Sequence, residues 1–209
     1  MMRNFVMLAD GVPVEPLLAE IDSVPGVWDR QTGRQRIRVQ REAKAIPLRG
    51  LRKSRIQGRA RRDVHESRFT TLSRSFPLAI DFIRSWAAKL DADLARARIV
   101  SLPPGQVVYD HVDRGEYYAR RNRYHLVLQA EQSWMRCGDE VVSMSPGELW
   151  WFDNKLSHEA RNEGSIDRIH MIFDLEPRDG LLGHRDRIVG DPSRIGTPVL
   201  TDSIGPRTA

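Results

Sequence analysis

Residues 110–115, DHVDRG, combine side chains that can bind a metal ion. His111 and Asp113 are two positions apart, and extended backbone at this spacing points both side chains to the same face. An ordinary polar turn would have the same sequence, so the rest of the chain has to distinguish the two readings. A second copy of the pattern, HRD at residues 184–186, has no later histidine, and we interpret it as a chance occurrence.

His158, in the run WWFDNKLSHEARNEG, is the candidate for a third ligand. Two neutral imidazoles and one carboxylate on one face, with the other positions open, form the ligand set of Fe(II) sites that activate oxygen. The only cysteine, Cys137, rules out a thiolate-based zinc site, so a metal would need imidazole and carboxylate ligands. The pattern therefore predicts a metal site formed by His111, Asp113 and His158.

The turn sequence NEG after His158 is followed by a strand pattern. If the two strands form a hairpin centred on Glu163, His158 lies directly opposite Arg168, with Cβ atoms roughly 5 Å apart. A guanidinium there would bind a carboxylate through two parallel hydrogen bonds, which lysine does not reproduce. His170 shares the face of Arg168, where it has either a core role or a pocket role.

The segment RNRYHLVLQ alternates in the way of a half-buried strand. One face carries Arg123, His125 and Val127. The other carries Tyr124, Leu126 and Leu128. If the aliphatic face packs against a helix, the basic residues face the interior of the protein.

Short strand patterns dominate the chain after one clear helix. Residues 75–94 predict that helix, with Pro77 in its first turn. Residues 35–49 alternate as a strand does, and about eight short β-like runs follow the helix. This organisation predicts a mainly β fold, a sandwich or barrel. A jelly roll (a cupin-like double-stranded β-helix) with one or more supporting helices is the form that fits about eight strands. We expect one domain over residues 1–175, with its core at 45–175, and a C-terminal extension or tail over 176–209.

Composition and charge limit the class of protein. The chain has 209 residues, of which 40% are hydrophobic and 29% charged, and it contains no apolar run near the length of a membrane span. Its start lacks the apolar core of a signal peptide, so we expect a cytoplasmic protein that is not bound to a membrane. The net charge is +5, but residues 30–62 carry many arginines and one acid, Glu42. This tract is either a site for phosphates or carboxylates or a solvated surface.

From about residue 45 to residue 175 the sequence resembles the aspartyl/asparaginyl β-hydroxylase family of Fe(II)- and 2-oxoglutarate-dependent oxygenases. The matching segments occur in order: AIPLRG, SLPPGQVVYDHVD, RYHLVLQ, PGELWWFDNKLSHEARNEG and DRIHMIFDL. The ten-residue step from His158 to Arg168 also fits this family. Asp113 stands where the vertebrate members have glycine, so the full triad is more similar to the short bacterial members. A serine of those vertebrate members falls near Val100.

The resemblance implies roles for individual residues. His111, Asp113 and His158 would hold iron, Arg168 would bind the distal carboxylate of 2-oxoglutarate, and His125 with Arg123 would lie near its other end. It also implies O₂ as a reactant and ascorbate as an optional stimulant. Asp153 and Asn154, just before His158, are either supporting groups of the site or plain turn residues.

The resemblance implies hydroxylation of a C–H bond in an amino acid, free or Asp/Asn-like in a peptide or protein, with succinate and CO₂ as coproducts. Arginines near the site, namely Arg49, Arg114, Arg120 and Arg121, would suit a substrate that bears a carboxylate. Two other functions remain open: an oxygenase that acts on nucleic acid or nucleobases through the basic tract, and a non-catalytic metal-binding cupin module. The sequence gives no indication of the oligomeric state.

Overall fold

The computed structural model describes residues 4–51 and 65–183. The second HRD copy, most of the expected tail and residues 52–62 of the basic tract lie outside the described residues. The strands are β1 (Phe5–Ala9), β2 (Lys44–Gly50), β3 (Arg68–Phe69), β4 (Ala92–Leu102), β5 (Val107–His111), β6 (Asn122–Gln129), β7 (Ser133–Cys137), β8 (Glu140–Val142), β9 (Leu149–Phe152), β10 (His158–Asn162) and β11 (Arg168–Pro177). The α-helices are α1 (Glu15–Asp22), α2 (Pro77–Lys89) and α3 (Glu116–Ala119), and the 3₁₀ turns are η1 (Val27–Asp29), η2 (Arg34–Arg36), η3 (Arg38–Gln40) and η4 (Leu72–Ser75).

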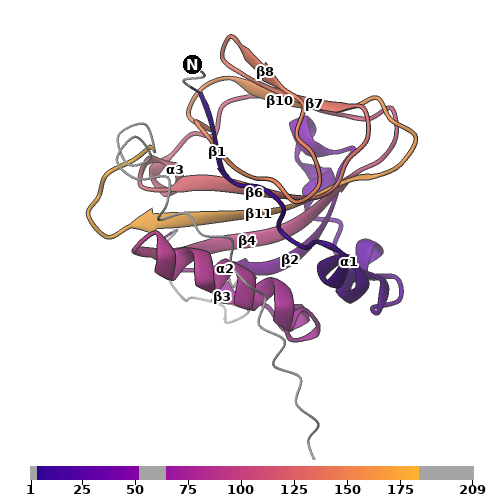
Figure 1. The fold of residues 1–209 in the computed structure, drawn as a ribbon, viewed down its shortest axis with the longest axis horizontal. Helices are drawn as coiled ribbons and strands as arrows, with labels where there is room; N and C mark the ends of the chain where they lie inside the picture. Colours follow the sequence, from indigo (N-terminus) through magenta and orange to yellow (C-terminus); the bar gives the residue numbers. More distant parts are fainter. Residues whose placement is uncertain (1–3, 52–64, 184–209) are drawn as a thin grey trace, which may run out of the picture.

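The strands form two antiparallel sheets that face each other (Figure 1). The larger sheet has the order β1-β9-β6-β11-β4-β2-β3, and the smaller has the order β5-β10-β7-β8. The predicted mainly β jelly roll is therefore confirmed. Because β1 pairs with β9, the N-terminal strand belongs to the same sheet as the later strands. None of the helices among the described residues is long and apolar enough to cross a membrane.

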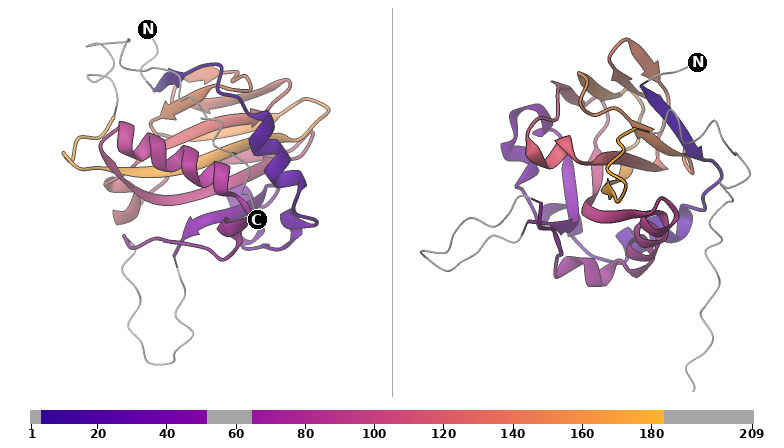
Figure 2. Two further views of the ribbon diagram at one scale, coloured as in Figure 1. Left: turned by 60° about the horizontal axis from the view of Figure 1, so that its bottom comes forward. Right: turned by 90° about the vertical axis from the view of Figure 1, so that its left-hand side faces the viewer.

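Helix α2 lies along the outer side of the larger sheet, with α1 beside it (Figures 1 and 2). It begins at Pro77 rather than at 75, and Pro77 lies in its first turn as predicted, because proline there lacks only an N–H that has no helical partner. Ile83 and Trp86 are almost fully buried against the sheet, and each such side chain contributes roughly 1.5–3 kcal/mol on burial. The helix ends at Lys89 rather than at 94, because Asp91 adopts a φ of 46° and β4 starts at Ala92.

The alternation predicted for β6 is confirmed. Tyr124, Leu126 and Leu128 pack in the core between the larger sheet and the helices. Val127, on the opposite face, packs in a second core between the two sheets. Arg123 and His125 share the face of Val127, so the strand points them into the interior of the jelly roll.

The strand predicted over residues 35–49 is wrong in its first half. Residues 34–40 form the 3₁₀ turns η2 and η3, and only Lys44–Gly50 is a strand. The alternation of Arg36, Ile37 and Arg38 gave the strand signal, yet Ile37 is 47% exposed and neither arginine is buried. An alternating charge pattern without a buried face does not require a strand.

The predicted hairpin between His158 and Arg168 is also wrong. Strand β10 pairs with β5 and β7 in the smaller sheet, whereas β11 pairs with β4 and β6 in the larger one. The connection at residues 163–167 therefore crosses from one sheet to the other. Its turn is held by Asn162, whose Nδ2 donates to the carbonyl oxygens of Leu102 at 2.9 Å and Ile166 at 2.7 Å. His158 and Arg168 are thus not cross-strand neighbours.

Candidate metal centre and pocket

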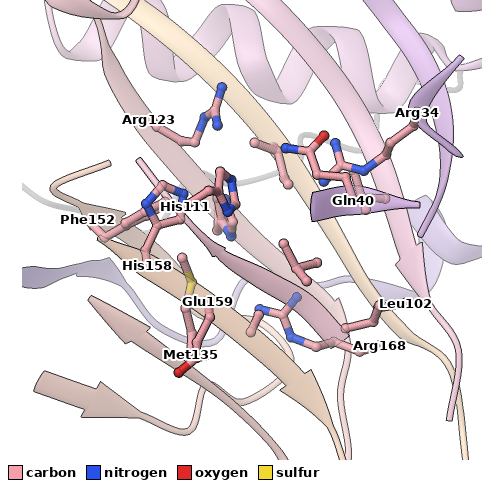
Figure 3. A pocket seen from close by; sticks show the side chains of 15 residues that line it. Arg34, Gln40, Leu102, His111, Arg123, Met135, Phe152, His158, Glu159 and Arg168 are labelled. Carbon is pink, nitrogen blue, oxygen red and sulfur yellow. The ribbon is translucent and has the colours of Figure 1, made fainter. Parts of the chain in front are cut away.

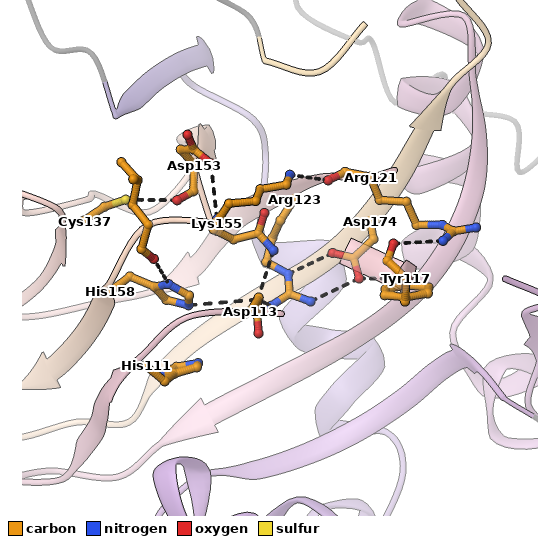
Figure 4. Close-up of polar contacts among 12 residues, drawn as sticks. His111, Asp113, Tyr117, Arg121, Arg123, Cys137, Asp153, Lys155, His158 and Asp174 are labelled. Atoms are coloured by element: carbon orange, nitrogen blue, oxygen red, sulfur yellow. Dashed lines mark hydrogen bonds and ion pairs between the residues drawn. The ribbon is translucent and has the colours of Figure 1, made fainter. Parts of the chain in front are cut away.

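The three predicted ligands meet at one edge of the smaller sheet. His111 ends β5 and His158 begins β10, and the two residues are paired across the strands. Their ring centroids are 4.3 Å apart, and His158 Nε2 lies 4.0 Å from Asp113 Oδ2 (Figure 4). One ligand atom from each of the three residues falls within 4.8 Å of the others. The structure therefore brings together the residues that the sequence selected.

Backbone carbonyls fix the orientation of both histidines. The Nδ1 of His111 lies 2.7 Å from the carbonyl oxygen of Tyr109, and that of His158 lies 2.9 Å from the carbonyl oxygen of Leu156. A carbonyl only accepts hydrogen bonds, so each Nδ1 carries the proton and each Nε2 keeps a free lone pair. Burial, with a smaller contribution from His111, lowers the pKa of His158 to about 4. His158 is therefore a neutral imidazole near pH 7, as metal ligation requires.

Asp113 is held by a buried polar network. Burial favours a higher pKa for this carboxyl, but Arg123 and the Asn154 amide offset it, so the pKa lies below its usual value. Asn154 Nδ2 donates to Asp113 Oδ2 at 3.0 Å, and Arg123 Nη1 donates to the same oxygen. Arg123 also donates from Nε and Nη2 to Asp174 at 2.8 and 3.1 Å, and Tyr117 Oη donates to Asp174 at 2.9 Å (Figure 4).

The sequence suggested Arg123, Asn154 and Asp153 for the site, and the structure shows the contacts of each. Arg123, expected near 2-oxoglutarate, uses three N–H groups on two carboxylates, so its observed contacts orient Asp113, the carboxylate of the triad. Asn154 supports the site, as one of its two expected roles required. Asp153 does not contact the triad; its backbone oxygen accepts from Cys137 Sγ at 3.2 Å.

The donor set fits Fe(II). Two neutral imidazoles and one ionised carboxylate within 4.8 Å of one another match the ligand pattern of non-haem iron oxygenases. The buried contacts to Asp113 and the two carbonyl contacts hold each ligand in place, as outer-shell partners of metal ligands do. The triad borders a pocket lined by Arg34, Gln40, Val100, Leu102, Val108, His111, Arg123, His125, Met135, Phe152, His158, Glu159, Ala160, Arg168 and Ile172 (Figure 3).

Arg168 is a buried cation in this pocket. Its residue is 5% exposed, and no ion pair found among the described residues includes it. Burial alone lowers the pKa of its guanidinium to about 10. A buried charge is costly unless it is paired, so an anion bound beside this guanidinium would stabilise it.

His125 and His170 lie side by side behind this cation. His125 lines the pocket with its ring edge-on to Phe152, at a centroid distance of 5.0 Å. His170 is fully buried, does not line the pocket, and has its Nδ1 3.4 Å from that of His125. Burial, followed by the charge of Arg168, lowers the pKa of both rings well below the usual range. Both are therefore neutral, and of the two only His125 can touch a ligand in the pocket.

The sequence missed Arg34 and Gln40, which line the pocket from η2 and η3. None of the four arginines expected there lines it. Arg49 donates to the carbonyl oxygen of Leu94 at 3.1 Å, Arg120 and Arg121 pair with Glu176, and Arg114 is exposed. Ser101 is also outside the pocket, because its Oγ donates to Asp167 Oδ2 at 2.6 Å. No local signal distinguished Arg34 from the other arginines of the basic tract.

The sequence also matches that of a known protein family. A sequence profile described as Aspartyl/Asparaginyl beta-hydroxylase matches residues 59–177, more than half of the chain. The chain belongs to the aspartyl/asparaginyl β-hydroxylase family. The matched region contains all three triad residues and Arg168, and it ends where β11 ends.

Solved structures show the same fold at low sequence identity. A 2OG-Fe(II) oxygenase family oxidoreductase from Burkholderia pseudomallei is 12% identical, with a TM-score of 0.56 over 83% of this chain and 84% of its own. A Trichoplax adhaerens prolyl hydroxylase, in complex with a hypoxia inducible factor oxygen degradation domain peptide fragment, is 13% identical, with a TM-score of 0.56 over 85% of each chain. A Pseudomonas putida prolyl-4-hydroxylase is 16% identical, with a TM-score of 0.50 over 85% of this chain and 94% of its own. This member of the β-hydroxylase family therefore has the fold of 2-oxoglutarate oxygenases.

Proposed function

We propose that the protein is an Fe(II)- and 2-oxoglutarate-dependent dioxygenase that hydroxylates a C–H bond of an amino acid, free or within a peptide. Succinate and CO₂ are the coproducts. The observation that carries the proposal is the pairing, within one pocket, of a two-histidine, one-carboxylate triad with the buried guanidinium of Arg168, which has no ion pair among the described residues.

Each side chain of the site would have its own role in binding the metal or the cosubstrate. His111, Asp113 and His158 would hold iron, which when bound supplies the activation of O₂ by electrons from 2-oxoglutarate. Arg168 would bind the distal carboxylate of 2-oxoglutarate through its planar fork, which orients the cosubstrate toward the metal. His125, neutral and buried, is available to donate or accept one hydrogen bond at the other end of the cosubstrate.

The protein environment also limits side reactions. Val100, Leu102 and Ile172 supply an apolar wall, and Phe152 packs on both His125 and His158 at centroid distances of 5.0 and 5.1 Å. A wall of this kind excludes water from the reacting atoms and strengthens the electrostatic contacts of the ligands.

The test is succinate release from 2-oxoglutarate by the purified protein with Fe(II), ascorbate and air. Candidate substrates are free amino acids, short Asp/Asn peptides and oligonucleotides, the last of which also examine the basic tract. We expect turnover in the native protein and none in His158→Ala or Asp113→Ala. Asp93→Ala, which removes an exposed carboxylate of β4, serves as the matched control and retains turnover.

Normal turnover in either triad variant would remove the ligand assignment. Absence of any anaerobic complex between 2-oxoglutarate and the Fe(II)-loaded native protein would remove the proposed activity and favour a metal-binding module. Stimulation by oligonucleotides alone would move the substrate class to nucleic acid.

A further inference from the structure

Besides Arg168, a second arginine without an ion pair among the described residues enters the pocket, and it comes from a different wall. Arg34 and Gln40 belong to the turns η2 and η3, outside the two sheets, and their side chains lie next to each other in Figure 3. They face the pocket from the side opposite Phe152 and His158, whereas Arg168 enters below them from β11 (Figure 3). Arg123 also lines the pocket, but it is paired with Asp113 and Asp174. Arg34 and Arg168 are therefore two separate cationic positions of the pocket without an ion pair among the described residues.

The charge of Arg34 lacks a partner in the part of the chain that the structure describes. Its Nε is buried without a hydrogen bond, and no ion pair found among the described residues includes it. The residue is partly exposed, so the side chain runs from the surface inward and ends in the pocket. Burial, followed by the charges of Arg98 and Arg123, lowers the pKa of the guanidinium to about 9, and the opposing effect of Asp113 is smaller. An anion in the pocket would relieve this cost.

Gln40 adds an acceptor at the same place. Its Oε1 is buried and has no hydrogen-bond partner among the described residues. A buried amide oxygen without a donor costs about 1–3 kcal/mol, so buried groups of this kind usually have a partner. A ligand with an N–H group would satisfy it. The two side chains together thus match a carboxylate that lies beside an N–H group.

The segment that carries these residues is fixed to the metal-binding strand. Arg41 stacks on Tyr109 at 5.4 Å from the ring centroid, and Tyr109 is two residues before His111 on β5. Turn hydrogen bonds, from Ile37 N to the Arg34 oxygen at 2.9 Å and from Gln40 N to the Ile37 oxygen at 2.8 Å, hold η2 and η3 together. A ligand held by Arg34 would therefore lie beside the strand that carries His111.

The cosubstrate does not account for Arg34. In the proposed function, the distal carboxylate of 2-oxoglutarate pairs with Arg168, and its other end lies at the metal and His125. Arg34 is then an additional cation of the pocket without an ion pair among the described residues. Because Arg34 and Arg168 come from different walls, two ligands can each place one carboxylate against one guanidinium.

We propose that Arg34 and Gln40 bind the head group of the substrate, which is a free α-carboxylate next to an N–H group. This inference rests on the proposed function and narrows its substrate class. A free amino acid and the C-terminal residue of a peptide both carry this head group, whereas an internal Asp or Asn residue of a protein does not.

The first experiment compares four sets of compounds as stimulants of succinate release by the iron-loaded, full-length protein. The sets are free L-amino acids, their N-acetyl derivatives, their carboxamides, and peptides blocked at both ends. N-acetyl amino acids mimic a peptide C-terminus, and carboxamides lack the carboxylate. We expect stimulation by the first set or the second and none by the other two. Stimulation by carboxamides or blocked peptides to the same degree would overturn the proposal.

The second experiment uses Arg34→Gln with Arg36→Gln as its matched control. Both variants remove one positive charge from η2, but Arg36 is exposed and does not line the pocket. We expect Arg34→Gln to raise the KM for the stimulating compound about 30-fold or more, as loss of one partner of a buried charge pair does. Gln40→Met is expected to raise it about tenfold. Arg36→Gln leaves it unchanged.

A parallel measurement separates this inference from the proposed function. The anaerobic affinity of the Fe(II)-loaded protein for 2-oxoglutarate is expected to be unchanged in Arg34→Gln and weakened in Arg168→Gln. If Arg34→Gln instead weakens 2-oxoglutarate binding and leaves the KM of the stimulant intact, Arg34 binds the cosubstrate and the inference is wrong. If 2-oxoglutarate binds and is consumed but no compound with a free carboxylate stimulates its turnover, the inference fails alone. If 2-oxoglutarate does not bind, the proposed function fails first.

Discussion

Two buried arginines of the pocket are expected to affect stability in opposite directions. Arg168 has no counter-ion among the described residues, and burial lowers its pKa from the usual 12.5 to about 10, which means that folding disfavours its charge by about 3 kcal/mol. Arg123 is as buried, but its contacts with Asp113 and Asp174 raise its pKa above the usual value despite burial. We therefore expect replacement of Arg168 by methionine to stabilise the ligand-free protein and the same replacement of Arg123 to destabilise it.

The magnitudes follow from the partners. Because replacing a buried charge by an apolar residue of similar volume commonly stabilises a protein by about 1–4 kcal/mol, Arg168→Met is expected to raise the free energy of unfolding by about 2 kcal/mol. In a chain of 209 residues this corresponds to a Tm increase of about 4–8 °C. Arg123→Met leaves two carboxylates buried without their cation, so a loss of about 3–5 kcal/mol is expected.

The assay is urea or thermal unfolding of both variants and the native protein, loaded with Mn(II), with and without 2-oxoglutarate. At 1,000 times its Kd the cosubstrate stabilises a protein that binds it by about 4 kcal/mol. When 2-oxoglutarate is added, the native protein should therefore become more stable than Arg168→Met, since the variant has lost the guanidinium that pairs with the carboxylate of the cosubstrate. The order of stability of the two proteins is thus expected to reverse.

The pH dependence provides a further check. The pKa of Arg168 is lower in the folded state, so its destabilising effect is fully present below about pH 10 and is relieved only as the pH rises through that value. The stability difference between Arg168→Met and the native protein is therefore expected to be constant between about pH 6 and 9. A folded Arg168→Met that is less stable than the ligand-free native protein would refute the reasoning, because Arg168 would then have a structural partner.

Three further outcomes test the structure around the site. Asp174→Asn weakens the support of Arg123 and hence of Asp113, so Mn(II) affinity measured by calorimetry should fall by about tenfold or more; unchanged affinity would mean that the network does not orient the ligand. Phe173→Ala removes a fully buried ring stacked on the core and should cost about 3–5 kcal/mol in urea unfolding with an unchanged m value; a loss below about 1 kcal/mol would place this ring outside the cooperative core. Burial raises the pKa of Cys137 to about 12, so the thiol should react with a disulfide reagent at pH 8 only as fast as the protein opens; rapid reaction in the folded state would contradict its burial.

The parts of the site that could be predicted from the sequence depend on local backbone geometry. Alternation along β6 placed Arg123 and His125 opposite the aliphatic face, because the two faces of a strand alternate with a period of two. The spacing of His111 and Asp113 was interpreted in the same way, but β5 ends at His111 and Asp113 lies in the loop that follows it. These predictions needed no knowledge of which strands pair.

Arg34 could not be predicted because its role depends on its surroundings in three dimensions. Its neighbours in the basic tract, such as Arg41 and Lys44, pair with Glu42 and Asp29 at the surface. In the sequence all of these cations are alike. Only the three-dimensional arrangement shows that one guanidinium is buried without an ion pair among the described residues, and this difference decides which cation is available to a ligand.

The hairpin prediction failed in its geometry, but Arg168 still lies in the pocket of the metal centre. In a jelly roll, consecutive strands often belong to opposite sheets, so a short turn can join two strands that face each other across the interior rather than pair. Across such an interior, the inward face of β10 and the inward face of β11 meet the same cavity. His158 and Arg168 therefore contribute to one pocket from opposite walls, which leaves room between them for a ligand that chelates the metal at one end and meets the guanidinium at the other. Direct cross-strand neighbours, with Cβ atoms roughly 5 Å apart, would have left no such space.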